Sequence, residues 1–268
     1  MRRMKTLISF GCAVCLTAGA AHAASGVLIV EKTTSGGTPQ TTQMQIEPNR
    51  MRAGSADPGA AKNVFIFDGT KQVMYIIDGS KKTYNEVTKA DIDALAGQVS
   101  DAMAKMRQQM EKMPPEQRQQ LEAVMKGRGG MGAGAPVKPK TTYRKIGTDT
   151  VGKWTCDKYE GYDDGQKTSE VCTVDPKVLG FTASDFAVTE KFAEFFGKLM
   201  PANARQMFTF SAETQGFSGV PVRRVTTVAG QAVTSEIVEV SRQSFSDATF
   251  AVPAGYQKME FAGGRRGR

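Results

Sequence analysis

Two cysteines are the residues whose spacing points most directly to chemistry. Cys156 and Cys172 flank the turn sequence Asp163-Asp164-Gly165, and alternating polar and apolar residues on either side predict a β-hairpin. Asp164 lies eight residues from each cysteine, so antiparallel pairing centred there places the two thiols side by side. In an oxidising compartment this predicts a disulfide, which would stabilise the fold by roughly 3 kcal/mol. The alternative is a metal or redox site, but the spacing is not Cys-x-x-Cys and no downstream histidine could complete a zinc shell.

The sequence contains few other residues or motifs that are typical of catalytic sites. The single histidine, His22, lies in a segment that we expect to be removed. There is no Gly-x-Ser-x-Gly elbow, and the glycine-rich GRGGMGAG lacks the Lys-Ser/Thr ending of a phosphate loop. The carboxylate pair Asp91 and Asp93 occupies a helix-capping position, as Asp163 and Asp164 occupy a turn. The sequence therefore predicts a protein that is not an enzyme, with no catalytic residue, no metal site and no cofactor.

A stripe of methionines is the most unusual feature. Apolar residues alternate at spacings of four and three along one predicted helix over residues 88–113: Ile92, Ala96, Val99, Met103, Met106, Met110 and Met113. This spacing places them on one narrow face. Thr88 or Asp91 is expected to cap the start, and Pro114-Pro115 to end the helix before a short second one reaching residue 126.

The stripe has four interpretations. Methionines fill irregular cores, and they also line grooves that accept apolar or unfolded ligands. Soft thioethers select copper(I), although copper sites usually recruit histidine too. A coiled-coil dimer seam is the fourth possibility, but alanine and methionine stand where leucine would be expected.

The chain begins with a predicted secretory signal peptide at residues 1–23. Arg2, Arg3 and Lys5 precede an apolar run, and small residues occupy the cleavage positions at Ala21 and Ala23. Cleavage near Ala23 would leave a periplasmic or secreted protein whose net charge falls from +8 to +5. No basic patch with interleaved aromatics suggests nucleic-acid binding, and at most peripheral membrane contact is expected.

Strand patterns dominate the mature chain. Residues 64–67 and 73–77 are apolar on both faces, so we expect them to be covered on both sides or to cover something that is not always protein. Asp68-Gly69 and Asp78-Gly79 each predict a tight hairpin. A later helix, capped near Thr182 or Ser184, carries Phe186, Phe192, Phe195, Phe196 and Leu199. The pattern favours an α+β fold built on one long antiparallel sheet, with helices that include the long methionine-rich one over one face.

Several segments together resemble a family of exported bacterial proteins, domain of unknown function 4412. They are FDGTKQVMYIIDGSKKTYNEV, MPPEQRQQLEAVMKG, GKWTCDKYEGYDDGQKTSEVCTV and ATFAVPAGYQKMEF. That family is grouped with the lipoprotein-carrier (LolA/LolB-like) folds, so the resemblance implies a sheet curled into an incomplete barrel, lidded by helices around an apolar cavity. We expect one such domain at residues 24–262, with a helical insertion at 88–126, a flexible link at 127–140 and a basic tail at 263–268.

These patterns lead to one main functional hypothesis. The protein is expected to bind or carry a lipid, a lipoprotein or another apolar small molecule between sheet and helices, through Met103, Met106, Met110, Phe192, Phe195 and Phe196. The alternative is a stress-linked chaperone or interaction module acting through residues 88–126. For that alternative, MPPEQRQQL is similar to the Leu-Thr-x-x-Gln motif of the Spy and CpxP chaperones, with Met113 at the leucine and Gln117 matching. The sequence leaves the oligomeric state open.

Overall fold

The computed structural model describes residues 25–56, 63–114, 116–117, 141–199, 215–228 and 230–261. Four predicted segments lie outside these residues: the signal peptide, the link at 127–140, the tail at 263–268 and most of the second short helix.

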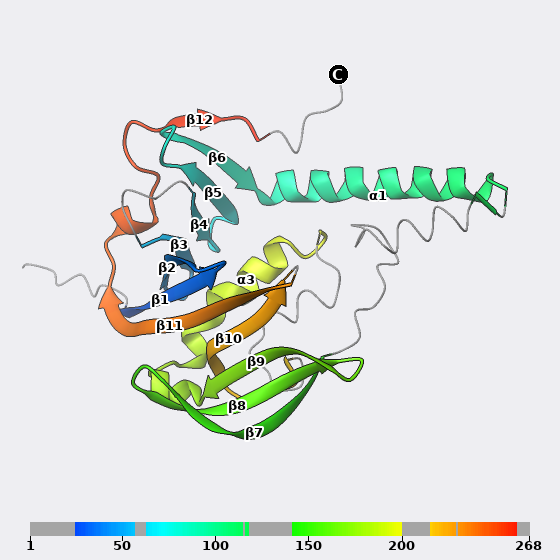
Figure 1. The fold of residues 1–268 in the computed structure, drawn as a ribbon. Coiled ribbons are helices and arrows are strands. Elements are labelled where there is room, and N and C mark those ends of the chain that lie inside the picture. The colour runs from blue at the N-terminus through cyan, green and yellow to red at the C-terminus, as the bar shows by residue number, and fades with distance from the viewer. Residues whose placement is uncertain are drawn as a thin grey trace, which may run out of the picture.

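Within the described residues, twelve strands form one sheet that curls without closing (Figure 1). In spatial order the strands are β12 (Gln257–Met259), β6 (Thr83–Thr88), β5 (Val73–Asp78), β4 (Val64–Asp68), β3 (Arg50–Ser55), β2 (Thr38–Ile46), β1 (Ser25–Ser35), β11 (Gln231–Ser244), β10 (Val220–Val228), β9 (Gln166–Val174), β8 (Trp154–Asp163) and β7 (Thr142–Val151). The expected long sheet is therefore present, but it is not wholly antiparallel, because β12 pairs with β6 in parallel.

The two predicted Asp-Gly hairpins are confirmed, with longer turns than a tight hairpin has. Four residues separate β4 from β5 and β5 from β6. The side chains of Asp68 and Asp78 each accept hydrogen bonds from the backbone N–H groups two and three residues ahead, at 2.9 to 3.1 Å. Gln72 and Lys82 end these turns with φ of 53° and 52°. The aspartate thus opens each turn instead of forming its centre.

The predicted disulfide is also confirmed. Cys156 and Cys172 are bonded, with their Cα atoms 5.5 Å apart, and the β8–β9 turn lies at Asp164 and Gly165. A register shift near Gly161 makes Lys158 the partner of Cys172, so the cysteines are diagonal neighbours and not directly opposite each other. Diagonal side chains on one face are still close enough to join.

The methionine-rich helix, α1 (Lys89–Glu111), follows β6 without a connecting residue. Thr88 caps it through a capping box with Asp91, as the sequence predicted. The helix extends outward from the end of β6 instead of turning back over the sheet (Figure 1), and Ile92 is its only buried residue. This corrects the expectation that the methionine-rich helix covers one face. With no loop before it, α1 has no residues with which to turn back.

A shorter helix, α3 (Ala187–Phe195), lies inside the curl of the sheet instead (Figure 1). Two short 3-10 turns precede it, η2 (Pro176–Leu179) and η3 (Ala183–Phe186), the second beginning at the predicted cap Thr182. We call the face of the sheet that α3 covers the inner face. The opposite face of β4 and β5 packs on the C-terminal segment around Phe250 in the 3-10 turn η5 (Asp247–Phe250). The strands predicted to be covered on both sides are therefore covered on the outer face and over part of the inner face, at Phe67 and Met74, whereas Phe65 on the inner face stays 45% exposed.

Candidate apolar site on the inner face

Two neighbouring rows of apolar residues cross the inner face from strand to strand. The first, which we call the covered row, consists of Val27, Ile46, Met51, Phe67, Met74 and Val87, each opposite the next in the sheet register. Residues directly opposite on paired strands project to the same face. All of them except the partly buried Met51 are buried, and α3 packs on most of the row.

The second row lies two residues further along every strand, on the same face. We call it the open row: Ile29, Met44, Ala53, Phe65 and Ile76, again opposite one another in order. Phe65 is 45% exposed and Met44 is 37% exposed, whereas Phe67 in the covered row is 1% exposed. The other three residues, Ile29, Ala53 and Ile76, are partly buried, so the sheet presents a partly uncovered apolar strip beside the part that α3 covers.

The predicted phenylalanines come together on α3. Phe192 and Phe195 meet the ring of Phe67 edge-on, with ring centroids 5.2 and 5.3 Å apart. Phe196 contacts both of them, with centroids at 4.9 and 5.0 Å. Phe195 is fully buried, and the other two are partly buried at the edge of the same cluster. Phe192 and Phe196 therefore pack against the same core cluster as Ile29 and Ile76 of the open row.

The predicted methionines lie elsewhere. Met103, Met106 and Met110 are partly buried on α1 and belong to none of the core clusters of the described residues. Val87, at the end of β6, belongs to the covered row, so α1 leaves the sheet on the side away from the open row. Within the described residues, the structure groups the three phenylalanines and does not bring the three methionines to them.

Polar contacts tie the segment carrying α3 to the sheet. Arg242 on β11 donates to both carboxylate oxygens of Asp185, at 3.1 and 2.7 Å, and to the carbonyl of Gly180 at 2.6 Å. Burial alone would raise the pKa of Asp185, but hydrogen bonds from Arg242 and from Thr182 outweigh it and hold that pKa below its ordinary value. At the other end of α3, Lys198 pairs with Asp93 of α1 at 3.1 Å.

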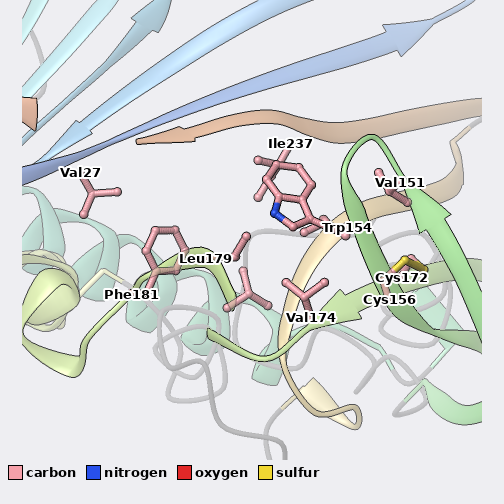
Figure 2. Close-up of a cluster of buried hydrophobic side chains, with 11 residues drawn as sticks. Val27, Val151, Trp154, Cys156, Cys172, Val174, Leu179, Phe181 and Ile237 are labelled. Carbon is pink, nitrogen blue, oxygen red and sulfur yellow. A yellow bond between two sulfur atoms is a disulfide. The ribbon is translucent and has the colours of Figure 1, made fainter. Parts of the chain in front are cut away.

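A second core cluster adjoins the open row. It contains Trp154, Leu179, Phe181 and the disulfide, and it reaches Val27 on β1 (Figure 2). Ile29 packs against both this cluster and the one under α3. The open row thus begins at the junction between the two halves of the core.

Among the residues that the structure describes, no group of three or more His, Cys, Asp or Glu side chains could hold a metal ion. In the same residues, no helix is long and apolar enough to cross a membrane. The chemistry that the inner face offers is contact with an apolar surface.

Sequence reasoning did not identify the open row. Its signals were present, because Met44 alternates with polar neighbours and Phe65 lies in a run that is apolar on both faces. Neither signal reveals that Met44 and Phe65 stand on either side of Ala53, since that depends on the register of three strands.

Comparison with known proteins gives a family and a set of distant structures. Residues 131–256 match the model of the domain of unknown function family DUF4412, which confirms the predicted resemblance over that part of the chain. No protein of curated function matches the sequence.

Similar solved structures include an uncharacterized conserved protein from Thermus thermophilus, with 9% identity, a TM-score of 0.42, and 89% of this chain and 91% of that chain covered. The MucA/MucB complex of Pseudomonas aeruginosa matches with 9% identity and a TM-score of 0.39 over 90% of this chain and 60% of that chain. A putative outer membrane lipoprotein-sorting protein domain from Vibrio parahaemolyticus matches with 8% identity and a TM-score of 0.28 over 84% and 89%. These TM-scores are too low to carry an argument about function.

Proposed function

We propose that the protein is a non-enzymatic, exported binding protein that holds an apolar ligand, a lipid or the acyl part of a lipoprotein, on the open row of the inner face. The observation that carries this proposal is the exposure of Phe65 and Met44 beside a row that α3 buries. Contiguous exposed apolar surface on a folded protein commonly marks a place where something binds.

The geometry favours an elongated ligand. The open row crosses five paired strands, β1 to β5, and neighbouring strands lie about 4.8 Å apart, so the row extends over roughly 19 Å. Phe192 on α3 and Phe196 just after it pack against the same core cluster as Ile29 and Ile76 of the row. An alkyl chain lying along the row would contact all five residues.

Burial of apolar area would drive binding. Each 100 Å² of apolar surface removed from water contributes on the order of 2.5 kcal/mol, less the cost of ordering the ligand. Met44 adds a flexible thioether that adapts to different chains. This surface therefore suits a class of apolar ligands more than one exact shape.

Displacement of a fluorescent fatty acid from the mature protein tests the proposal. Phe65→Ser should raise the dissociation constant about tenfold, because a ligand on the open row would lose its contact with an aromatic ring that is 45% exposed. Val178→Ser is the matched control, since Val178 is 61% exposed in η2 and lies outside the open row. Either of two results would refute the proposal. One is an equal affinity of the wild type and Phe65→Ser for the fatty acid. The other is a protein that retains no lipid after purification from the periplasm and binds no dye.

One observation favours the alternative of a chaperone or interaction module acting through residues 88–126. Beyond Ile92, α1 extends away from the sheet (Figure 1), and Val99 on its apolar stripe is 40% exposed. Deleting residues 97–126 keeps the capping box and Ile92 in place, so the sheet should stay folded. Loss of the ability to suppress aggregation of an unfolded client would support this alternative, and unchanged suppression would exclude it.

A further inference from the structure

A small pocket with charged walls lies beside the open row. It has a volume of about 200 Å³ and is lined by Glu31, Val222, Arg224, Ser235, Glu236 and Ile237, among others. Its apolar floor residues Val222 and Ile237 belong to the same core cluster as Val27. Pockets for whole drug-sized ligands usually measure about 300–1,000 Å³, so this one has room for only part of a larger molecule.

Glu31 links the pocket to the open row. It lies two residues after Ile29 on β1, so both side chains project to the same face, about 7 Å apart along the strand. Along the inner face of β1 the residues change from apolar Val27 and Ile29 to polar Glu31 and Thr33. A ligand lying here would meet apolar surface at one end and charge at the other.

Two β-bulges shape the pocket. On β11 the register with β1 shifts between Glu239 and Ile237, and on β10 the register with β9 shifts between Pro221 and Arg223. A bulge redirects the side chains next to it and is common beside functional sites. Here the two bulges bring Val222 and Ile237 to the pocket floor, with Arg224 in its wall.

The charges in the pocket are not neutralised by ion pairs. Oε1 of Glu31 accepts hydrogen bonds from the hydroxyls of Ser235 and Thr33, which fix the carboxylate in place. Within the described parts of the chain, no cation lies within ion-pair distance of Glu31 or Glu236, and no carboxylate lies within that distance of Arg224. One carboxylate, Glu31, and one guanidinium, Arg224, therefore project from the face on which the pocket lies, without charged partners of their own.

We propose that this pocket binds the headgroup of a zwitterionic amphiphile, with a primary ammonium at Glu31 and a phosphate at Arg224, while its alkyl chains lie on the open row. An ammonium forms a charge-assisted hydrogen bond with a carboxylate, and a guanidinium binds a phosphate through two parallel hydrogen bonds. The ligand class is thus a phospholipid with an ethanolamine-type headgroup. This inference rests on the proposed function, because the open row holds the chains.

Calorimetry with short-chain lipids below their micelle concentration tests the headgroup separately from the chains. The mature protein should bind a phosphatidylethanolamine about tenfold more tightly than a phosphatidylglycerol with the same chains, because the latter has no ammonium. Glu31→Gln, which keeps the shape and removes the charge, should abolish that preference and leave fatty-acid displacement unchanged. Arg224→Gln should weaken both lipids by a similar factor, since both carry the phosphate.

Glu239→Gln is the matched control for Glu31→Gln, because Glu239 is an exposed carboxylate on the neighbouring strand β11 and lies outside the pocket. Equal affinity for the two lipids in the wild type, or a preference that survives Glu31→Gln, overturns the headgroup assignment. In either case, a loss of fatty-acid binding in Phe65→Ser would still uphold the apolar site. Failure of the proposed function would appear differently, as unchanged fatty-acid binding in Phe65→Ser.

Discussion

Arg242 and Asp185 form a two-point contact between residues 57 positions apart: Nη1 donates to Oδ1 at 3.1 Å, and Nη2 donates to Oδ2 at 2.7 Å. Asp185 lies in η3, directly before α3, and its side chain is only 7% exposed. The contact therefore fixes the start of the helix that covers the inner face to β11.

Removing this contact should destabilise the fold. Arg242→Ala leaves the buried Asp185 carboxylate without its guanidinium. We expect the free energy of unfolding to fall by about 1–3 kcal/mol. The lower part of this range is favoured because the side chain of Arg242 is 41% exposed. Urea unfolding measures the change. Lys145→Ala provides the control, since the Lys145–Asp157 pair is exposed on both sides and its loss should cost less than about 1 kcal/mol. An equal effect of the two substitutions would contradict the role given to Arg242.

The same contact predicts a pH dependence. Because the pKa of Asp185 in the folded protein is held below its ordinary value of 3.8, the stabilisation is fully present above that value and is lost as the pH falls through the lower, folded pKa. The difference in unfolding free energy between wild type and Arg242→Ala should therefore be constant from about pH 7 to pH 5 and shrink below about pH 4. A difference that grew on acidification would have the wrong sign for this mechanism.

The disulfide should contribute much of the stability of the second core cluster, which contains Trp154, Leu179 and Phe181. Both cysteines are buried beside Trp154 (Figure 2), and they close a loop with a sequence separation of 16. The double change Cys156→Ser and Cys172→Ser should lower the unfolding free energy by roughly 3 kcal/mol. Unfolding with and without a reductant provides the check: the reductant should destabilise the wild type and leave the double variant unchanged.

Phe67 and Phe65 lie two residues apart on the same face of β4, but we expect Phe67 to matter mainly for stability and Phe65 mainly for ligand binding. Phe67→Ala removes a buried ring that contacts Phe192 and Phe195 and should cost about 3–5 kcal/mol. Phe65→Ala removes a ring that is 45% exposed and should cost clearly less, while weakening the binding of an apolar dye. Thermal unfolding and dye titration on both variants separate the two roles, and a large loss of stability in Phe65→Ala would show that the open row is core.

The first turn of α1 and the turns that follow it should also differ in how much their apolar side chains contribute to stability. Ile92 is 2% exposed in the cluster under α3, so Ile92→Ala should cost about 2–4 kcal/mol. Val99, two turns later on the same stripe, is 40% exposed, and Val99→Ala should change stability by less than about 1 kcal/mol. Urea unfolding measures both changes. Similar losses of stability would mean that the helix around Val99 packs as tightly as it does around Ile92.

Local patterns in the sequence were sufficient to predict several parts of this structure, because the forces behind them act over a few residues. The Thr88 cap and the hairpin turn at Asp164 and Gly165 are examples in which neighbouring residues satisfy each other's backbone. The disulfide followed from that hairpin, although the register offsets the two cysteines by two residues, since Cys172 lies opposite Lys158. The coverage of β4 and β5 on one face, and over part of the other, followed from runs that are apolar on both faces.

Only the tertiary structure decided which helix covers the sheet and which residues stay open. Both helices have an apolar stripe, but α1 continues directly from β6, whereas η2 and η3 provide the turns that bring α3 back over Phe67. The open row and the pocket at Glu31 depend on the register of strands far apart in the chain and on two bulges. By itself the sequence determined the strands, the turns and the covalent link, because these depend on neighbouring residues, whereas the candidate site arises from long-range pairing that no local pattern encodes.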